Sequence, residues 1–270
     1  MTMTTLKNAA LAVLLCTLML APAAFATDGV VLINQATALN GLPGCGSTGF
    51  PIVICQPGSY RLAGNLTVSG PEVGISITAG HVTLDLNGFA IIGPKLLLAS
   101  GVFSNQSWTT VENGQVSGFA FGIFLGANAN VVRNIAADSN DTGIAAFSGL
   151  IVDSSADGNR TVGIATTLNY GDLAVVNCRE ASSHTGIAIG GGEVIGSEVH
   201  NNQTGILVQS GHLSLSNNSI VDNAVAAVEF DLCCAGTVGY GGNVFQNDGA
   251  YVSGGNAVSM HNNVCGLTNC

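Results

Sequence analysis

Small and aliphatic residues recur together along most of this chain, at intervals of about 20 residues. A glycine directly precedes an aliphatic residue at Gly101-Val102, Gly122-Ile123, Gly143-Ile144, Gly163-Ile164, Gly186-Ile187 and Gly205-Ile206, and a degenerate copy stands at Ala227-Val228. A fixed period of this length indicates stacked repeats, each of which buries its apolar face only against its neighbours. The pattern therefore predicts a solenoid.

A second apolar position follows each of these pairs and predicts another short strand in every repeat. We expect its aliphatic residue to face inward, the next residue outward, and a small polar third residue to join a hydrogen-bonded ladder between coils. The triplets are Val111-Glu112-Asn113, Val132-Arg133-Asn134, Val152-Asp153-Ser154, Val176-Asn177-Cys178, Ile195-Gly196-Ser197 and Leu215-Ser216-Asn217. Neighbouring coils would pair as parallel strands around a continuous aliphatic column.

The N-terminus has the features of a secretory precursor. Lys7 is the only charge in residues 1–26, an apolar run follows it, and Ala24-Phe25-Ala26 has the form of a cleavage site. The alternative, an anchored helix, is disfavoured because the run is short for a bilayer. We expect a signal peptide at 1–26, an N-terminal cap at 27–59 and a parallel β-helix repeat domain at 60–270. The mature protein would be secreted or periplasmic, with no membrane span.

Charge and cysteine content narrow the classes of partner. The formal net charge is −10, which disfavours nucleic acid, and polyanionic glycans would need a bridging cation. Export permits disulfides, and the spacing favours local bridges between Cys45 and Cys55 and between Cys265 and Cys270. We expect Cys178 to be a buried, inert thiol rather than a nucleophile.

Several motifs resemble those of right-handed parallel β-helix proteins of the pectate-lyase-like superfamily. They are the Gly-aliphatic coils, Gln56-Pro57-Gly58-Ser59-Tyr60-Arg61-Leu62 and Val82-Thr83-Leu84-Asp85-Leu86-Asn87-Gly88-Phe89. The resemblance implies an all-β, single-stranded right-handed parallel β-helix over roughly residues 56–265. That superfamily includes lyases, hydrolases, epimerases and esterases as well as tailspikes and adhesins, so the fold does not select an activity. The catalytic signatures of its polygalacturonases and pectate lyases are not found in this sequence.

One column of outward positions is the strongest candidate for chemistry. Aligning the coils places Glu112, Arg133, Asp153 and Asn177 in successive strands, about 4.8 Å apart, with Arg133 between two carboxylates. An acid/base or calcium-assisted site is one interpretation, with the candidate calcium ligands on nearby turns at Asp138, Asp141 and Asp157. The other interpretation is a charge ladder that relieves repulsion and prevents misregistered stacking.

A second outward column combines aromatic and small residues. It is led by Phe103 and Phe124 and continues through Ala145, Ala165, Ala188, Leu207 and Glu229. Flat apolar surfaces suit stacking on sugar rings or contact with a partner. Phe103 and Phe124, with Asn177 of the first column, are the candidate ligand-binding residues, and ordinary apolar surface is the alternative.

Two functional hypotheses follow from these features. The first is an exported, non-catalytic scaffold that binds a polysaccharide or another cell-surface component through its elongated face. The second is a polysaccharide lyase or related carbohydrate-active enzyme, with Glu112, Arg133 and Asp153 as its catalytic candidates and calcium as its candidate cofactor. Most coils are close to minimum length, which leaves little chain for the walls of a deep cleft and favours the scaffold.

Overall fold

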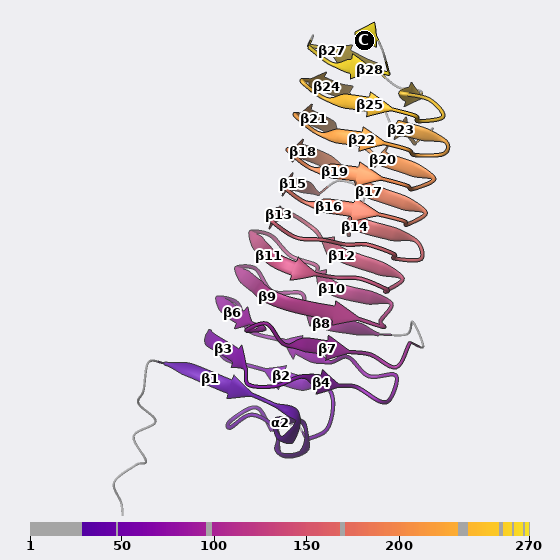
Figure 1. Cartoon of the computed structure of the whole chain (residues 1–270). Helices are drawn as coiled ribbons and strands as arrows, with labels where there is room; N and C mark the ends of the chain where they lie inside the picture. Colours follow the sequence, from indigo (N-terminus) through magenta and orange to yellow (C-terminus); the bar gives the residue numbers. More distant parts are fainter. Residues whose placement is uncertain are drawn as a thin grey trace, which may run out of the picture. The chain divides into compact units, whose positions relative to one another are not determined.

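The computed structural model describes residues 29–46, 48–95, 99–167, 171–231, 237–253, 256–260, 262–266 and 268–269. The chain divides into the units Met1–Val30 and Val31–Cys270. The second unit is a β-solenoid of about 10 turns, with 54% strand and 3% helix in the chain. Its strands stack coil upon coil in Figure 1. The predicted parallel β-helix is thus confirmed.

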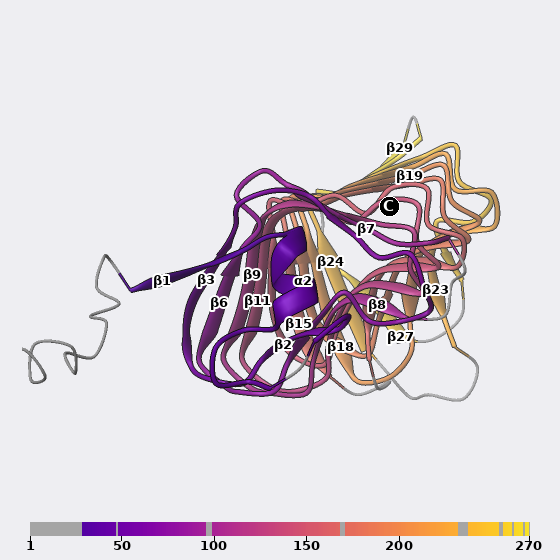
Figure 2. The same ribbon diagram turned by 90° about the horizontal axis from the view of Figure 1, so that it is seen from below.

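Three sheets form the faces of this solenoid, and their strands are parallel except for the last pair, β28 and β29. Figure 2 shows the coils superposed along the stacking direction. The first sheet contains β1 (Val30–Ile33), β3 (Gly58–Leu62), β6 (Val82–Asp85), β9 (Thr109–Ser117), β11 (Asn130–Ala136), β13 (Gly149–Val152), β15 (Asp172–Val176), β18 (Gly191–Ile195), β21 (His212–Ser216), β24 (Thr237–Gly241) and β27 (Asn256–Ser259). The second contains β2 (Ile52–Ile54), β5 (Ile75–Ile77), β8 (Ser100–Ser104), β10 (Phe121–Leu125), β12 (Thr142–Ala146), β14 (Val162–Thr166), β17 (Thr185–Ile189), β20 (Thr204–Val208), β23 (Ala226–Phe230) and β26 (Val252–Ser253).

The third sheet contains β16 (Arg179–Ala181), β19 (Glu198–His200), β22 (Ser219–Val221), β25 (Val244–Gln246), β28 (Val264–Cys265) and β29 (Thr268–Asn269). In the first coils the same face is formed by β4 (Leu66–Thr67), β7 (Ala90–Ile92) and the second half of β9, which pairs with β7. The long strand β9 therefore bends around the corner between the first and third faces.

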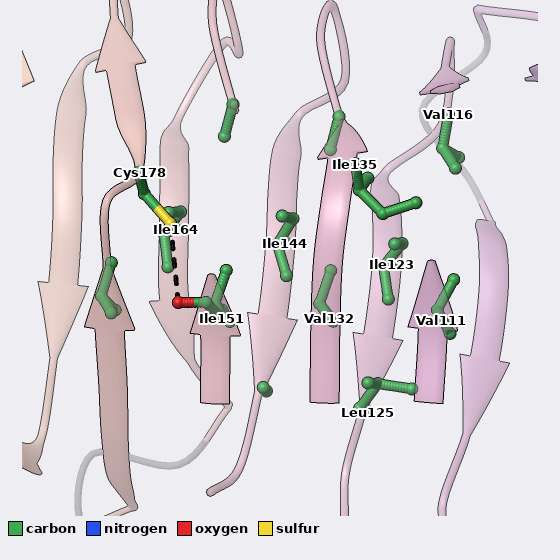
Figure 3. Packing of buried hydrophobic residues seen from close by; sticks show 14 of the residues in the cluster. Val111, Val116, Ile123, Leu125, Val132, Ile135, Ile144, Ile151, Ile164 and Cys178 are labelled. Atoms are coloured by element: carbon green, nitrogen blue, oxygen red, sulfur yellow. Dashed lines mark hydrogen bonds between the residues drawn. The ribbon is translucent and has the colours of Figure 1, made fainter. Parts of the chain in front are cut away.

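The core is a set of aliphatic columns with one residue from each coil. In the second sheet, Ile123, Ile144 and Ile164 lie directly opposite one another in register and are fully buried. Figure 3 shows this column facing Val111, Val132 and Ile151 of the first sheet. Burial of these side chains against neighbouring coils is the main source of stability in such a stack.

Close approach between coils explains why a glycine precedes each buried aliphatic residue. A Cβ atom at Gly143 would lie 2.6 Å from the carbonyl oxygen of Gly163 and 2.7 Å from Nδ2 of Asn159. At Gly122 it would lie 2.6 Å from the carbonyl oxygen of Gly143. The repeated glycine therefore makes room for the next coil's backbone and for a buried asparagine.

The expected ladder of small polar residues is present, with a change of register. Ser154, Cys178 and Ser197 are buried as predicted, and the Ser197 hydroxyl accepts a hydrogen bond from the Cys178 amide at 3.1 Å. The stack continues through Asn218 rather than Asn217. Burial raises the pKa of the Cys178 thiol to about 11, and Figure 3 shows its contact with the Ile151 carbonyl. The expected burial of the Cys178 thiol is thus confirmed, and a thiol with a raised pKa is a poor nucleophile at neutral pH.

The predicted cap region contains the one helix in the described part of the chain, α2 (Gln35–Asn40). Asn34 caps it by accepting a hydrogen bond from the amide of Thr37. The predicted Cys45–Cys55 disulfide is present. Cys265 is also disulfide-bonded, and its expected partner, Cys270, lies outside the described residues, as does the expected signal peptide. No helix in the described ranges is long and apolar enough to cross a membrane.

Candidate functional site

An open groove follows the corner between the first and third faces. Its volume is about 770 Å3, and it crosses the coils from β6 to β16. Asn113, Asn134, Asp153 and Asn177 contribute one polar side chain per coil, and Asp85, which lies opposite Glu112 rather than Asn113, adds a carboxylate from β6. The rest of the lining consists of Asn87, Gly88, Gly114, Gln115, Ile135, Ala136, Ser154, Ser155 and Arg179.

A repeated backbone conformation forms the polar wall of the groove. Asn113, Asn134, Asp153 and Asn177 have φ values of 59°, 52°, 49° and 51°. Asparagine and aspartate adopt this left-handed conformation more readily than other side-chain-bearing residues. We call these four residues the corner row, and each directly follows a strand of the first sheet or a bend in one. The turn between two faces therefore selects the residue types that line the groove.

Hydrogen bonds connect this wall from coil to coil. The Asn134 side-chain amide donates to Oδ1 of Asn113 at 2.9 Å, and the Asn113 amide donates to Oδ1 of Asp85 at 3.1 Å. Asn177 donates to Oδ1 of Asp153 at 3.4 Å. These bonds orient the amides and leave other donor and acceptor positions free, because an amide group has more hydrogen-bonding capacity than one bond uses.

The charge at one end of the groove belongs to Asp85. Partial burial would raise its pKa, but hydrogen bonds from Asn113, the Asn87 amide and Arg61, with the positive charge of Arg61, hold the pKa below its ordinary value. The Arg61–Asp85 ion pair has an N–O distance of 2.9 Å. Asp85 is thus an ionised acceptor at neutral pH.

The expected charge column is only partly assembled. Arg133 pairs with Glu112, as predicted, through both register and an ion pair. On its other side, however, Arg133 lies opposite Val152, and Asp153 and Asn177 fall one position later, in the corner row. Their placement in the same column as Glu112 was therefore wrong. The cause is the pair of adjacent aliphatic residues in β13, where Ile151 rather than Val152 is the buried one.

The described arginines all pair with carboxylates. Besides the pairs above, Arg160 contacts Asp141 at 2.9 Å and Arg179 contacts Asp157. A guanidinium has hydrogen-bond donors and no acceptor. Of these arginines, Arg179 lines the groove and offers it such donors.

The candidate calcium ligands are engaged with other groups. Asp138 accepts a hydrogen bond from the Asp157 amide at 2.9 Å, while Asp141 and Asp157 are in the ion pairs just described. In the described ranges, no three or more His, Cys, Asp or Glu side chains are grouped in a way that could hold a metal ion.

The aromatic column lies on the outer face of the second sheet, as the sequence indicated. Phe103 and Phe124 are in register and their rings stack, with centroids 5.4 Å apart and planes 12° from parallel. Phe121 meets Phe124 edge-on at 5.3 Å. Ala145 and Ala165 continue the column. Both phenylalanines are partly buried, so part of their surface is used within the cluster.

Comparisons with known proteins bear on the fold. No protein-family model and no curated protein matches the chain. Among solved structures, the pectate lyase Pel9A aligns with a TM-score of 0.62 and 13% identity over 89% of this chain and 79% of the lyase. This chain shares the parallel β-helix fold of that lyase.

More distant likenesses are the A-modules of the Azotobacter vinelandii mannuronan C-5 epimerases AlgE4 and AlgE6. Their TM-scores are 0.43 and 0.41 at 15% and 12% identity. The alignments cover 89% and 78% of this chain, and 87% and 81% of the respective modules. A shared fold does not select an activity, so the function has to be argued from the groove itself.

The sequence interpretation missed two features of the structure. Asn113 and Asn134 were assigned to a buried ladder, although both line the groove, and their preference for left-handed backbone was the available signal. Glu180 was overlooked entirely. It is fully buried inside the solenoid, in the row that holds Val199 and Ile220 in the next strands. Aligning those three positions would have revealed a carboxyl at an inward site.

Proposed function

We propose that this protein is an exported parallel β-helix that binds an extended, uncharged polysaccharide along the groove without cleaving it. The observation that supports this most strongly is the corner row. It repeats a polar side chain at the spacing of stacked strands, about 4.8 Å, which is of the same order as the length of a sugar ring. Successive sugars could therefore meet similar hydrogen-bonding groups in successive coils.

The charges in and around the groove favour a neutral ligand. Asp85 and Asp153 line it, its Arg179 is already paired with Asp157, and the chain as a whole carries a formal charge of −10. A polyuronate would be repelled by this field in the absence of a bridging cation. Hydroxyl-rich neutral glycans, by contrast, form hydrogen bonds with amides and carboxylates at little electrostatic cost.

Export is part of the proposal and rests on two observations. The Cys45–Cys55 disulfide is of a kind that persists in oxidising compartments. The first 26 residues have the composition of a signal peptide. We expect a full-length fusion to be secreted when it is expressed. N-terminal sequencing should show that the mature protein has lost residues 1–26.

Removing two amides from the groove should weaken glycan binding roughly 10- to 30-fold, because each lost hydrogen bond contributes about 1 kcal/mol. The variant Asn134→Gly/Asn177→Gly keeps the left-handed backbone, since glycine adopts it freely. Asn217→Gly is the matched control, because Asn217 has the same conformation (φ 58°) and is not among the groove-lining residues. A glycan array of neutral and uronate polysaccharides, followed by calorimetry on the positive glycan, provides the measurement.

The lyase hypothesis is tested on the same panel. Ultraviolet absorbance of unsaturated uronate ends, recorded with and without calcium, would grow only if the protein cleaves by elimination. Growth that disappears in Arg133→Ala would establish the lyase and overturn the non-catalytic scaffold. Equal glycan affinity in the double variant and in Asn217→Gly would contradict binding in the groove.

A further inference from the structure

A second surface of interest lies at the other ends of the first-sheet strands, where the chain enters β6 and β9. Trp108, directly before β9, is 59% exposed and is the only tryptophan in the chain. Its backbone is left-handed, with φ of 62°. Bulky residues rarely adopt this conformation, which here recurs at the same turn in the neighbouring coils.

The exposed indole is held in a defined orientation. His81 occupies the corresponding position one coil earlier and is also left-handed, with φ of 56°. The imidazole and indole rings are 4° from parallel, with centroids 5.9 Å apart. Backbone hydrogen bonds from His81 to Ser107 and from Trp108 to Asn128 tie the two turns to the coils that follow them. Stacking on His81 reduces the freedom of the indole before any ligand arrives, which lowers the entropic cost of binding.

Beyond Trp108, this row continues into a hollow. Register places Ala129 next to Trp108 in the following coil, and a methyl group covers little of an indole. Ala129 and Asn128 are among the residues that line a cavity of about 910 Å3, which extends past Ser148 to Asp172 and His212. The Ser148 hydroxyl donates to Oδ1 of Asn128 at 3.0 Å, so polar groups line this cavity in the coils that follow Trp108.

We propose that Trp108 and this hollow form a second carbohydrate site, which takes one or a few sugar rings of a neutral glycan. The C–H face of a pyranose stacks on the indole, and its hydroxyls bond to Asn128, Ser148 and Asp172. A flat apolar surface beside convergent donors and acceptors is the combination that recognises a sugar, because a sugar presents apolar faces and polar edges. This site shares a ligand class with the groove but none of its residues, so either can fail alone.

Tryptophan emission tests the proposal directly, since Trp108 is the only source of that signal. Soluble oligosaccharides of glucose, mannose, xylose and N-acetylglucosamine are titrated into the mature protein. We expect a saturable change in emission with at least one of them, together with protection from acrylamide quenching. The groove variant Asn134→Gly/Asn177→Gly should retain that change. Calorimetry should show at least tenfold weaker binding of the responding sugar to Trp108→Ala.

Tyr251→Ala is the matched aromatic control, because Tyr251 is 37% exposed and lines neither the groove nor the hollow. It should leave the Trp108 response unchanged, and thermal unfolding monitored by circular dichroism verifies that each variant is folded. Unchanged emission across the whole sugar panel would overturn the second site. If array binding persists and depends on Asn134 while emission is silent, only this inference fails. If emission responds and the groove variant binds the array as tightly as the natural chain, Trp108 is the glycan site and the proposal of binding in the groove fails.

Discussion

Replacing Glu180 by glutamine is expected to make the protein more stable at alkaline pH and to flatten the dependence of its stability on pH between 4.5 and about 8. Glu180 is 0% exposed and points into the solenoid. Burial raises its pKa from 4.5 to about 8, and the hydrogen bond from the Ser183 hydroxyl, at 2.7 Å, offsets only part of this effect. A charged carboxylate at this position would be expensive, so the native state holds it protonated near neutral pH.

The packing around Glu180 shows why relaxation cannot relieve this cost. A Cβ atom at Gly163 would lie 2.2 Å from one carboxyl oxygen, and one at Gly186 would lie 2.5 Å from the other. The two glycines therefore enclose the carboxyl group between neighbouring coils. Ser183 stands where other coils carry the larger buried residues Asn159 and Asn202, and this difference makes room for Glu180.

The direction of the pH effect follows from proton binding. The unfolded chain releases this proton near pH 4.5, whereas the folded chain retains it until about pH 8. Its contribution to stability is therefore complete below pH 4.5 and is lost as pH rises toward 8. The slope approaches about 1.4 kcal/mol per pH unit in that window, for a total loss of several kcal/mol. Glutamine has no proton to lose, so Glu180→Gln should lack this slope.

Guanidinium unfolding at a series of pH values measures the difference between Glu180→Gln and the natural chain. The control is Glu198→Gln, which removes a carboxyl from an exposed position on the neighbouring strand β19. The stability gained in Glu180→Gln, relative to this control, should increase from pH 4.5 to 8 and then level off. A gain that is constant with pH would mean that Glu180 ionises normally in the folded protein, contrary to its burial.

The sequence predicted the structure correctly where the pattern of glycine and aliphatic residues allowed only one alignment of the coils. In the second sheet, a glycine marks the start of each repeat, so Ile144 and Ile164 could be aligned without ambiguity, and their register is as predicted. In the first sheet, β13 and β15 carry aliphatic residues on both faces. Leu150 and Val152 point outward beside the buried Ile151, so alternation does not identify the inward residue.

That one-residue ambiguity decided the candidate site. Shifting a strand by one position exchanges its two faces, and here it moved Asp153 from the corner row into the charge column. Two kinds of information would have corrected it. One is the recurrence of asparagine where the backbone turns, because Asn113 and Asn134 need left-handed dihedrals. The other is the stacking of coils along the corner between the first and third faces, which brings Asp85 and Arg179 to one groove although 93 intervening residues separate them.

Replacing Gly143 by alanine is expected to lower the free energy of unfolding by several kcal/mol. The added methyl group would lie 2.6 Å from the Gly163 carbonyl oxygen and 2.8 Å from the Ala137 carbonyl oxygen. Both are backbone atoms. Moving the Gly163 carbonyl would disturb the pairing of β12 with β14, and moving the Ala137 carbonyl would disturb its hydrogen bond from the Asn159 side chain. Overpacking of a rigid site typically costs 1–3 kcal/mol, and more where backbone has to shift.

Gly64→Ala is the matched control, because a Cβ atom at Gly64 would meet nothing within 4 Å. Its stability should be unchanged or slightly increased, since alanine restricts the unfolded chain. Denaturant unfolding of both variants gives the comparison, and equal stabilities would contradict the role of glycine in coil spacing. Ala227 shows where the constraint ends. It occupies this position in β23, whose described pairing with β26 begins only at the next residue, Val228. The glycine is required where the following coil continues in full register. The glycine repeat in the sequence therefore follows from the close spacing of the coils.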